Sequence, residues 1–152
     1  MSKATVNGVS QYYGPRDRYE GVGGTEGTHS DQRYFVLDFG GANYATARGT
    51  LPAGTVVVGN AIVEVREPFA LGGTTPLLNV GVLTTEATNR LAQLSEAQAE
   101  ALGTYSLAPA GTLALNTPLA AATTIAVSLT GGGANTIGAV GKARLIVPIA
   151  GV

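Results

Sequence analysis

The sequence predicts an all-β protein: a single jelly-roll-like β-sandwich with one short helix and an extended N-terminal arm. Glycine and proline contribute 22 and 7 of the 152 residues, which is typical of turn-rich β proteins. Apolar and polar residues alternate along several short segments that turn residues separate. No charged residue occurs between Glu100 and Lys142, and glycine, proline and hydroxyl residues interrupt this stretch too often for a membrane-spanning helix.

The chain divides into a predicted arm, residues 1–32, and a predicted sandwich domain, residues 33–152. The arm shows neither helical nor strand periodicity, and glycine interrupts it repeatedly. Such a segment cannot offset its ordering entropy by burying its own side chains. It is therefore either disordered or ordered against a partner.

Alternation with a period of two begins at Tyr34 and predicts the strands of the sandwich. We expect a bulge at Gly59–Asn60, loops at Gly72–Gly73 and 131–135, and a short strand over 112–115. The predicted inward faces are Phe35, Leu37 and Phe39; Ala61, Val63 and Val65; Leu78, Val80 and Val82; Ile125, Val127 and Leu129; and Ala143, Leu145, Val147 and Ile149.

One helix and one strand end are marked by specific residues. Ser95 and Gln98 have the spacing of a capping box, which predicts a helix of about two turns that Gly103 ends. Pro148 cannot donate to a sheet ladder, so we expect the last strand to end at an edge or a bulge there.

No catalytic or metal-binding constellation is present. His29 is the single histidine, and Ser30 and Asp31 lie too close to it in sequence to form a relay. Glu64 and Glu67 point to opposite faces of a strand, whereas glycoside hydrolysis needs carboxyl groups that face each other. Cysteine is absent, and the carboxylates lack metal-ligand spacing. We expect no enzyme, no metal and no cofactor.

The charge balance also limits the partners. A net charge of −1 offers no general attraction to nucleic acid or to an anionic membrane, so we expect neither as a partner. The N-terminus lacks the apolar core of a signal peptide, which predicts a protein made in a cytoplasm.

Two sets of residues are candidate contact sites. The arm contains residue types that are enriched at interface hot spots, namely Tyr12, Tyr13, Arg16, Arg18 and Tyr19. Contact with a partner protein is one interpretation of this set; simple disorder and stacking on single-stranded nucleic acid are the others. The second set is the predicted outward face of one strand, a neutral surface suited to subunit packing: Thr124, Ala126, Ser128 and Thr130.

Several segments between residues 51 and 152 resemble small virion proteins of tailed bacteriophages, of the jelly-roll capsid decoration (cement) type. The segments are 51–55, 72–81, 117–119, 123–127 and 141–147. The resemblance does not extend to the arm. It implies a protein made in the host cytoplasm that binds the outer surface of a phage head between capsomers, as a homotrimer in contact with the major capsid protein.

Two alternative functions remain open at this stage. Another virion component, such as a head fibre base or a tail adaptor, fits the same resemblance. A carbohydrate-binding β-sandwich module would need exposed aromatic residues, yet tryptophan is absent and Tyr34, Tyr44 and Tyr105 are the tyrosines beyond the arm.

Overall fold

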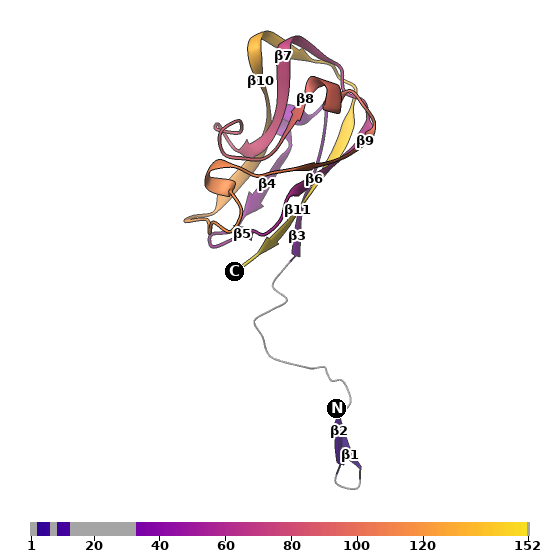
Figure 1. Ribbon diagram of the computed structural model, residues 1–152, viewed down its shortest axis with the longest axis vertical. Coiled ribbons are helices and arrows are strands. Elements are labelled where there is room, and N and C mark those ends of the chain that lie inside the picture. Colours follow the sequence, from indigo (N-terminus) through magenta and orange to yellow (C-terminus); the bar gives the residue numbers. More distant parts are fainter. Residues whose placement is uncertain (1–2, 7–8, 13–32, 152) are drawn as a thin grey trace. The chain divides into compact units, whose positions relative to one another are not determined.

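The computed structural model describes residues 3–6, 9–12 and 33–151 (Figure 1). The chain forms two compact units, residues 1–32 and 33–152. The first contains an antiparallel hairpin of β1 (Lys3–Val6) and β2 (Val9–Tyr12). The prediction that the arm contains no strand was wrong for these eight positions, because two four-residue strands are too short to establish a period.

The second unit is a sandwich of two antiparallel sheets. One sheet has the strand order β4-β10-β7-β8, and the other has the order β3-β11-β6-β9, with the short β5 also paired to β11. The strands are β3 (Arg33–Gly40), β4 (Arg48–Leu51), β5 (Val56–Val57), β6 (Ala61–Glu67), β7 (Leu71–Val82), β8 (Arg90–Ser95), β9 (Gly103–Leu107), β10 (Thr123–Ile137) and β11 (Lys142–Ala150). The helices are η1 (Tyr44–Thr46), α1 (Glu96–Ala99) and η2 (Gly111–Leu113).

The pairing scheme identifies the topology. Leaving aside the short β5, the first strand of this unit pairs with the last: β3 with β11, then β4 with β10, β6 with β9, and β7 with β8. The chain therefore resembles one long hairpin that is rolled up so that its paired segments alternate between the two sheets. This is the arrangement of a jelly roll, and it confirms the predicted fold class.

Alternate residues of both sheets fill the core, as the sequence predicts. Leu37, Phe39, Ala61, Val63, Val65, Leu78, Val80, Ile125, Val127, Ala143, Leu145, Val147 and Ile149 are buried. Phe35, Val82 and Leu129 are partly buried and pack against this cluster. The apolar alternation therefore located the core correctly, because every second residue of a strand points to the same face.

The two glycine-rich segments that the sequence assigns to loops are strands instead. Gly72–Gly73 belongs to β7 and residues 131–135 to β10, and the two strands pair as far as Leu71 and Ile137. The pairing has register shifts on either side of Gly132. Gly73 and Gly131 have φ values of +110° and +138°, so glycine accommodates irregular ladder positions here rather than ending the strands.

The capping box is confirmed, but the helix is shorter than predicted. Ser95 Oγ accepts a hydrogen bond from the Gln98 N–H at 3.2 Å, and Gln98 Oε1 accepts one from the Ser95 N–H at 3.0 Å. The helix has a single turn, and Gly103 begins β9 instead of ending the helix. The strand expected over 112–115 is also wrong, since η2 occupies Gly111–Leu113 and buries Leu113.

Pro148 lies within a central strand, not at an edge, and β11 continues past it. In an antiparallel pair, every second residue directs its backbone N–H and C=O groups toward the partner strand. Because the Gly41 N–H donates to the Gly141 carbonyl, these are the odd-numbered residues of β11 on the side of β3. The missing N–H of Pro148 therefore faces the other neighbour, where residues 58–60 separate β5 from β6. At the expected bulge, Gly59–Asn60, the strand is therefore interrupted completely between β5 and β6. Opposite this gap, the Pro148 carbonyl accepts a hydrogen bond from the Val58 N–H.

Candidate interaction surface

The two outward faces of the sandwich differ in charge. On the sheet β4-β10-β7-β8, the two central strands β7 and β10 contain no charged residue; Arg48 and Arg90 lie on the flanking strands β4 and β8. On the sheet β3-β11-β6-β9, charged side chains point outward from the three neighbouring strands β3, β11 and β6. The uncharged segment of the sequence predicts the neutral face, and the alternation of Glu64 with Arg66 predicts the outward charges of β6; that β3 and β11 extend this charged face follows from their pairing.

A row of polar side chains crosses the neutral face. Asn79 is completely buried, and its Nδ2 donates to Thr130 Oγ1 at 2.8 Å. Gln93 Nε2 donates to Asn79 Oδ1 at 2.7 Å, so the row links β8, β7 and β10. Ser128 lies opposite Asn79 in the pairing of β10 with β7, and its buried Oγ has no hydrogen-bond partner among the described residues.

Of the four residues proposed for subunit packing, three offer surface in a single chain. Thr124, Ser128 and Thr130 are partly exposed. Ala126 was expected to offer surface on this outward face, but it is completely buried and does not belong to the main core cluster. It lies opposite Gly81 on one side and Arg48 on the other. Strand alternation predicts the face to which a side chain points, but it does not predict whether other groups cover that side chain.

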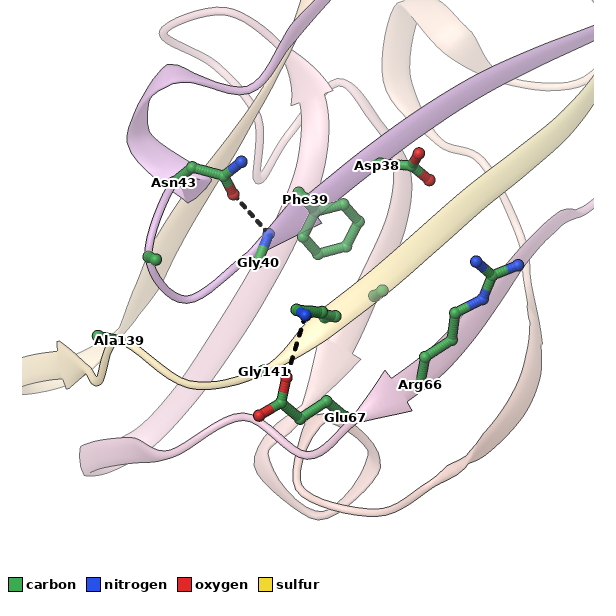
Figure 2. A pocket seen from close by; sticks show the side chains of 11 residues that line it. Asp38, Phe39, Gly40, Asn43, Arg66, Glu67, Ala139 and Gly141 are labelled. Carbon is green, nitrogen blue, oxygen red and sulfur yellow. Dashed lines mark hydrogen bonds and ion pairs between the residues drawn. The ribbon is translucent and has the colours of Figure 1, made fainter.

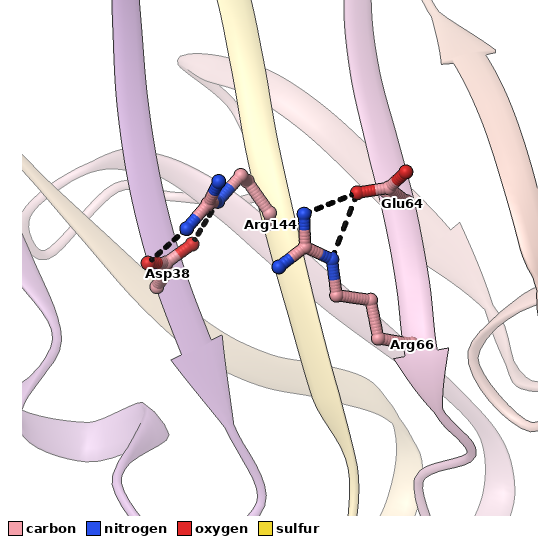
Figure 3. A network of polar contacts seen from close by, with 4 residues as sticks. All are labelled: Asp38, Glu64, Arg66 and Arg144. Atoms are coloured by element: carbon pink, nitrogen blue, oxygen red, sulfur yellow. Dashed lines mark hydrogen bonds and ion pairs between the residues drawn. The ribbon is translucent and has the colours of Figure 1, made fainter.

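Four charged residues form two ion pairs on the other face (Figure 3). Arg144 donates from Nε and Nη2 to both carboxylate oxygens of Asp38, at 2.6 and 3.0 Å. Arg66 contacts Glu64 Oε1 through Nε and Nη2, at 2.8 and 2.7 Å. The hydrogen bonds and positive charge of Arg144 lower the pKa of Asp38, and Asp38 in turn raises the pKa of Arg144.

The Asp38–Arg144 pair predicts a pH-dependent contribution to stability. Because folding lowers the pKa of Asp38, the contribution is complete above the unfolded pKa of about 3.9 and is lost as the pH falls through the folded pKa. The Asp38 side chain is 61% exposed, so we expect Asp38→Asn to lower the free energy of unfolding at pH 7 by less than about 1 kcal/mol. Urea titrations at pH 7 and near pH 2 measure the difference.

An Arg144→Gln background provides the control for this experiment. Once Arg144 is removed, Asp38→Asn should have almost no effect at pH 7, because the interaction that lowers the pKa is gone. An equal loss of stability at both pH values would show that Asp38 stabilises the fold through packing rather than through its charge.

A groove of about 350 Å³ lies beside these pairs, where β3, β6 and β11 meet the loops at 41–43 and 138–141 (Figure 2). Asp38, Phe39, Gly40, Ala42, Asn43, Arg66, Glu67, Ala139, Gly141, Lys142 and Ala143 line it. Its four charged residues are all paired: Lys142 Nζ lies 4.0 Å from Glu67 Oε1, and Asp38 and Arg66 pair with Arg144 and Glu64. Within the described ranges, no group of three metal-ligating side chains occurs and no helix is long and apolar enough to cross a membrane.

An apolar patch occupies the other end of the charged face. Tyr34 and Val36 on β3 are 63% and 48% exposed. In the pairing register they lie opposite Pro148 and Ile146 of β11, and Ile62 of β6 lies beyond Ile146. Exposed aromatic and aliphatic groups that are neighbours on one face are typical of interaction sites. The sequence contained this signal, because Tyr34 and Val36 alternate with the core residues of the same strand.

The structure covers the predicted arm contacts only in part. Tyr12 is the last residue of β2. Tyr13, Arg16, Arg18 and Tyr19 lie outside the described residues, as does His29. The expected contact between this set and a partner therefore stays a prediction.

Comparison with known proteins gives two similar solved structures. A chain in the capsid of Ralstonia phage GP4 is 20% identical with a TM-score of 0.50, over 86% of this chain and 91% of that chain. A chain in the capsid asymmetric unit of cyanophage Pam1 is 22% identical with a TM-score of 0.44, over 92% of this chain and 100% of that chain. No family model matches the sequence, and no curated protein is significantly similar. The likeness to the first chain shows a shared fold.

Proposed function

We propose that this protein is a structural virion component of a phage: a capsid decoration (cement) protein that binds the outside of the head between capsomers and stabilises it. The observation that carries this proposal is the jelly roll shared along almost the whole length of a chain in a phage capsid. The match covers 86% of this chain and 91% of that chain, so the likeness extends over most of both.

In this proposal, the protein has no catalytic activity and acts as a homotrimer that contacts the major capsid protein. The neutral outer face of β7 and β10 supports the subunit contact, because charged residues are depleted at the centre of protein interfaces. Thr124, Ser128 and Thr130 are the residues of the original set that supply surface there. The arm, with Tyr12, Tyr13, Arg16, Arg18 and Tyr19, reaches the shell. Neither nucleic acid nor a membrane takes part, and the protein is made in the host cytoplasm.

We expect the purified protein to be a trimer and to bind isolated phage heads that lack it. Light scattering should give three times the mass of the chain, and Thr124→Glu should dissociate the trimer by burying unpaired charges at the contact. Thr104→Glu is the matched control, because Thr104 is an exposed residue of β9 on the other sheet. A monodisperse monomer at high concentration would contradict the trimer. Immunogold labelling of a tail, instead of head faces, would favour a tail adaptor.

A further inference from the structure

The outer edge of β3 carries unpaired backbone groups. β3 is the end strand of its sheet and pairs with β11 alone. The hydrogen bond from the Gly41 N–H to the Gly141 carbonyl sets the alternation, so odd-numbered residues of β3 face β11. Tyr34, Val36 and Asp38 therefore direct their N–H and C=O groups away from the sheet. Within the part of the chain that the structure describes, no residue pairs with these groups.

This edge has few of the features that usually prevent strand addition, and the one charged side chain between Tyr34 and Asp38, that of Asp38, is paired with Arg144. β3 is eight residues long, contains neither lysine nor proline, and keeps an unshifted register with β11. By contrast, β4 and β9 have four and five residues, and β8 pairs with β7 through a register shift. A long, regular edge with exposed apolar side chains is a template for another strand. Tyr34 and Val36 provide those side chains.

The available window has a defined end. Gly40 would be the next residue whose backbone faces outward, but Asn43 occupies both of its groups. Asn43 Oδ1 accepts from the Gly40 N–H at 2.8 Å, and the Asn43 N–H donates to the Gly40 carbonyl at 3.2 Å. The chain thus closes its own edge at Gly40 and leaves it open from Tyr34 to Asp38.

We propose that an extended segment of the major capsid protein adds to this edge as a fifth main strand, pairing with the backbone of residues 34–38. The inference rests on the proposed function, and it names the contact by which the sandwich itself binds the shell. The segment should carry apolar side chains at alternate positions, which would pack against Tyr34 and Val36. It needs no charge of its own, since Asp38 is already paired with Arg144.

The symmetry of the proposed homotrimer excludes pairing of β3 with β3 of another copy in the same trimer. Pairing of β3 with β3 of another copy would be an isologous contact, which generates a two-fold axis. A homotrimer has only a three-fold axis, so its three β3 edges cannot pair with one another in that way. They remain available to a different chain.

Val36→Pro tests the proposal in the full-length protein. Proline removes an outward N–H and places its ring at the free edge, while the bonds to β11 are left in place because the N–H of Val36 does not face β11. We expect binding to heads to weaken by about tenfold or more, with the trimer mass unchanged. Val36→Thr, which keeps the N–H and a β-branched side chain, should bind within about threefold of wild type.

A second pair of variants distinguishes a loss of the strand contact from a general effect of a substitution on folding. Val36→Lys places a charge beside the open edge, and Thr104→Lys places one on the opposite edge strand of the same sheet. Only the first should weaken binding. Equal binding by wild type, Val36→Pro and Val36→Lys would overturn the inference.

Amide hydrogen exchange distinguishes the possible occupants. In the free protein, a peptide spanning residues 33–40 should contain rapidly exchanging amides that become protected on heads, whereas 103–107 should not change. Protection of the edge amides already in the free protein would mean that this chain itself covers β3, and would overturn the proposal. If the wild-type protein binds heads but its edge amides are not protected, the strand-addition proposal is overturned and the decoration function stands. If the wild-type protein does not bind heads at all, the decoration function is overturned as well.

Discussion

Deleting residues 1–31 is expected to weaken binding to phage heads by at least about a hundredfold. The arm holds three tyrosines and two arginines within eight positions, and these residue types each contribute about 2 kcal/mol or more where they act as hot spots. Loss of two such contacts amounts to roughly a thousandfold in affinity. The measurement is a binding titration of labelled protein on heads, with light scattering to confirm that the truncated protein remains a trimer.

A full-length control separates contact from chain length. Substituting Tyr12, Tyr13 and Tyr19 together by serine should reproduce most of the loss, because it removes the aromatic area but keeps every backbone position. Unchanged binding by the truncated protein would refute the role of the arm and leave the β3 edge as the proposed shell contact. In a trimer, three arms and three edges bind the same head together. A substitution that weakens one kind of contact therefore weakens it three times per trimer, and the overall affinity falls by more than that of a single contact.

Leu145→Ala is expected to lower the free energy of unfolding by about 2–5 kcal/mol, a large part of the 5–15 kcal/mol typical of a domain. Leu145 is completely buried in β11, an inner strand of its sheet, and lies opposite Leu37 on one side and Val63 on the other. Both of these neighbours are also buried, so the cavity has little freedom to collapse. Urea unfolding followed by circular dichroism measures the change.

Ile146→Ala is the matched control for Leu145→Ala. Ile146 is the next residue of β11, points to the outer face and is only half-buried, so the change should cost about 1 kcal/mol or less. A similar loss for both variants would mean that the outer face of this sheet is as tightly packed as the core. That result would mean that other residues cover Tyr34, Val36 and Ile146 in the folded protein.

Strand alternation predicted the part of the fold that depends on side-chain direction. It identified β3, β6, β11 and the first half of β10, residues 123–130, together with the faces they bury. Each of these segments has apolar residues at every second position. The capping box located α1 for a similar reason, since its two hydrogen bonds are made within four residues.

Sequence reasoning failed where pairing partners decide the structure. β4, β8 and β9 have no clear alternation and are strands because they complete a rolled hairpin whose other half lies far along the chain. The glycines at 72–73 and 131–133 resemble loops, but the two segments pair with each other as parts of β7 and β10. Their pairing is irregular, and glycine adopts the positive φ values that occur there. Neither partner is visible from local composition.

For the candidate site, the sequence by itself determined which residues can make contacts: a neutral segment without charge, an arm rich in tyrosine and arginine, and apolar residues at outward positions of β3. Only the tertiary structure decided which of these are accessible. It buries Ala126, joins Asp38 to Arg144 across 106 positions of sequence, and leaves the edge from Tyr34 to Asp38 open. Composition and period are local properties, whereas burial and free hydrogen-bonding groups depend on which strands become neighbours.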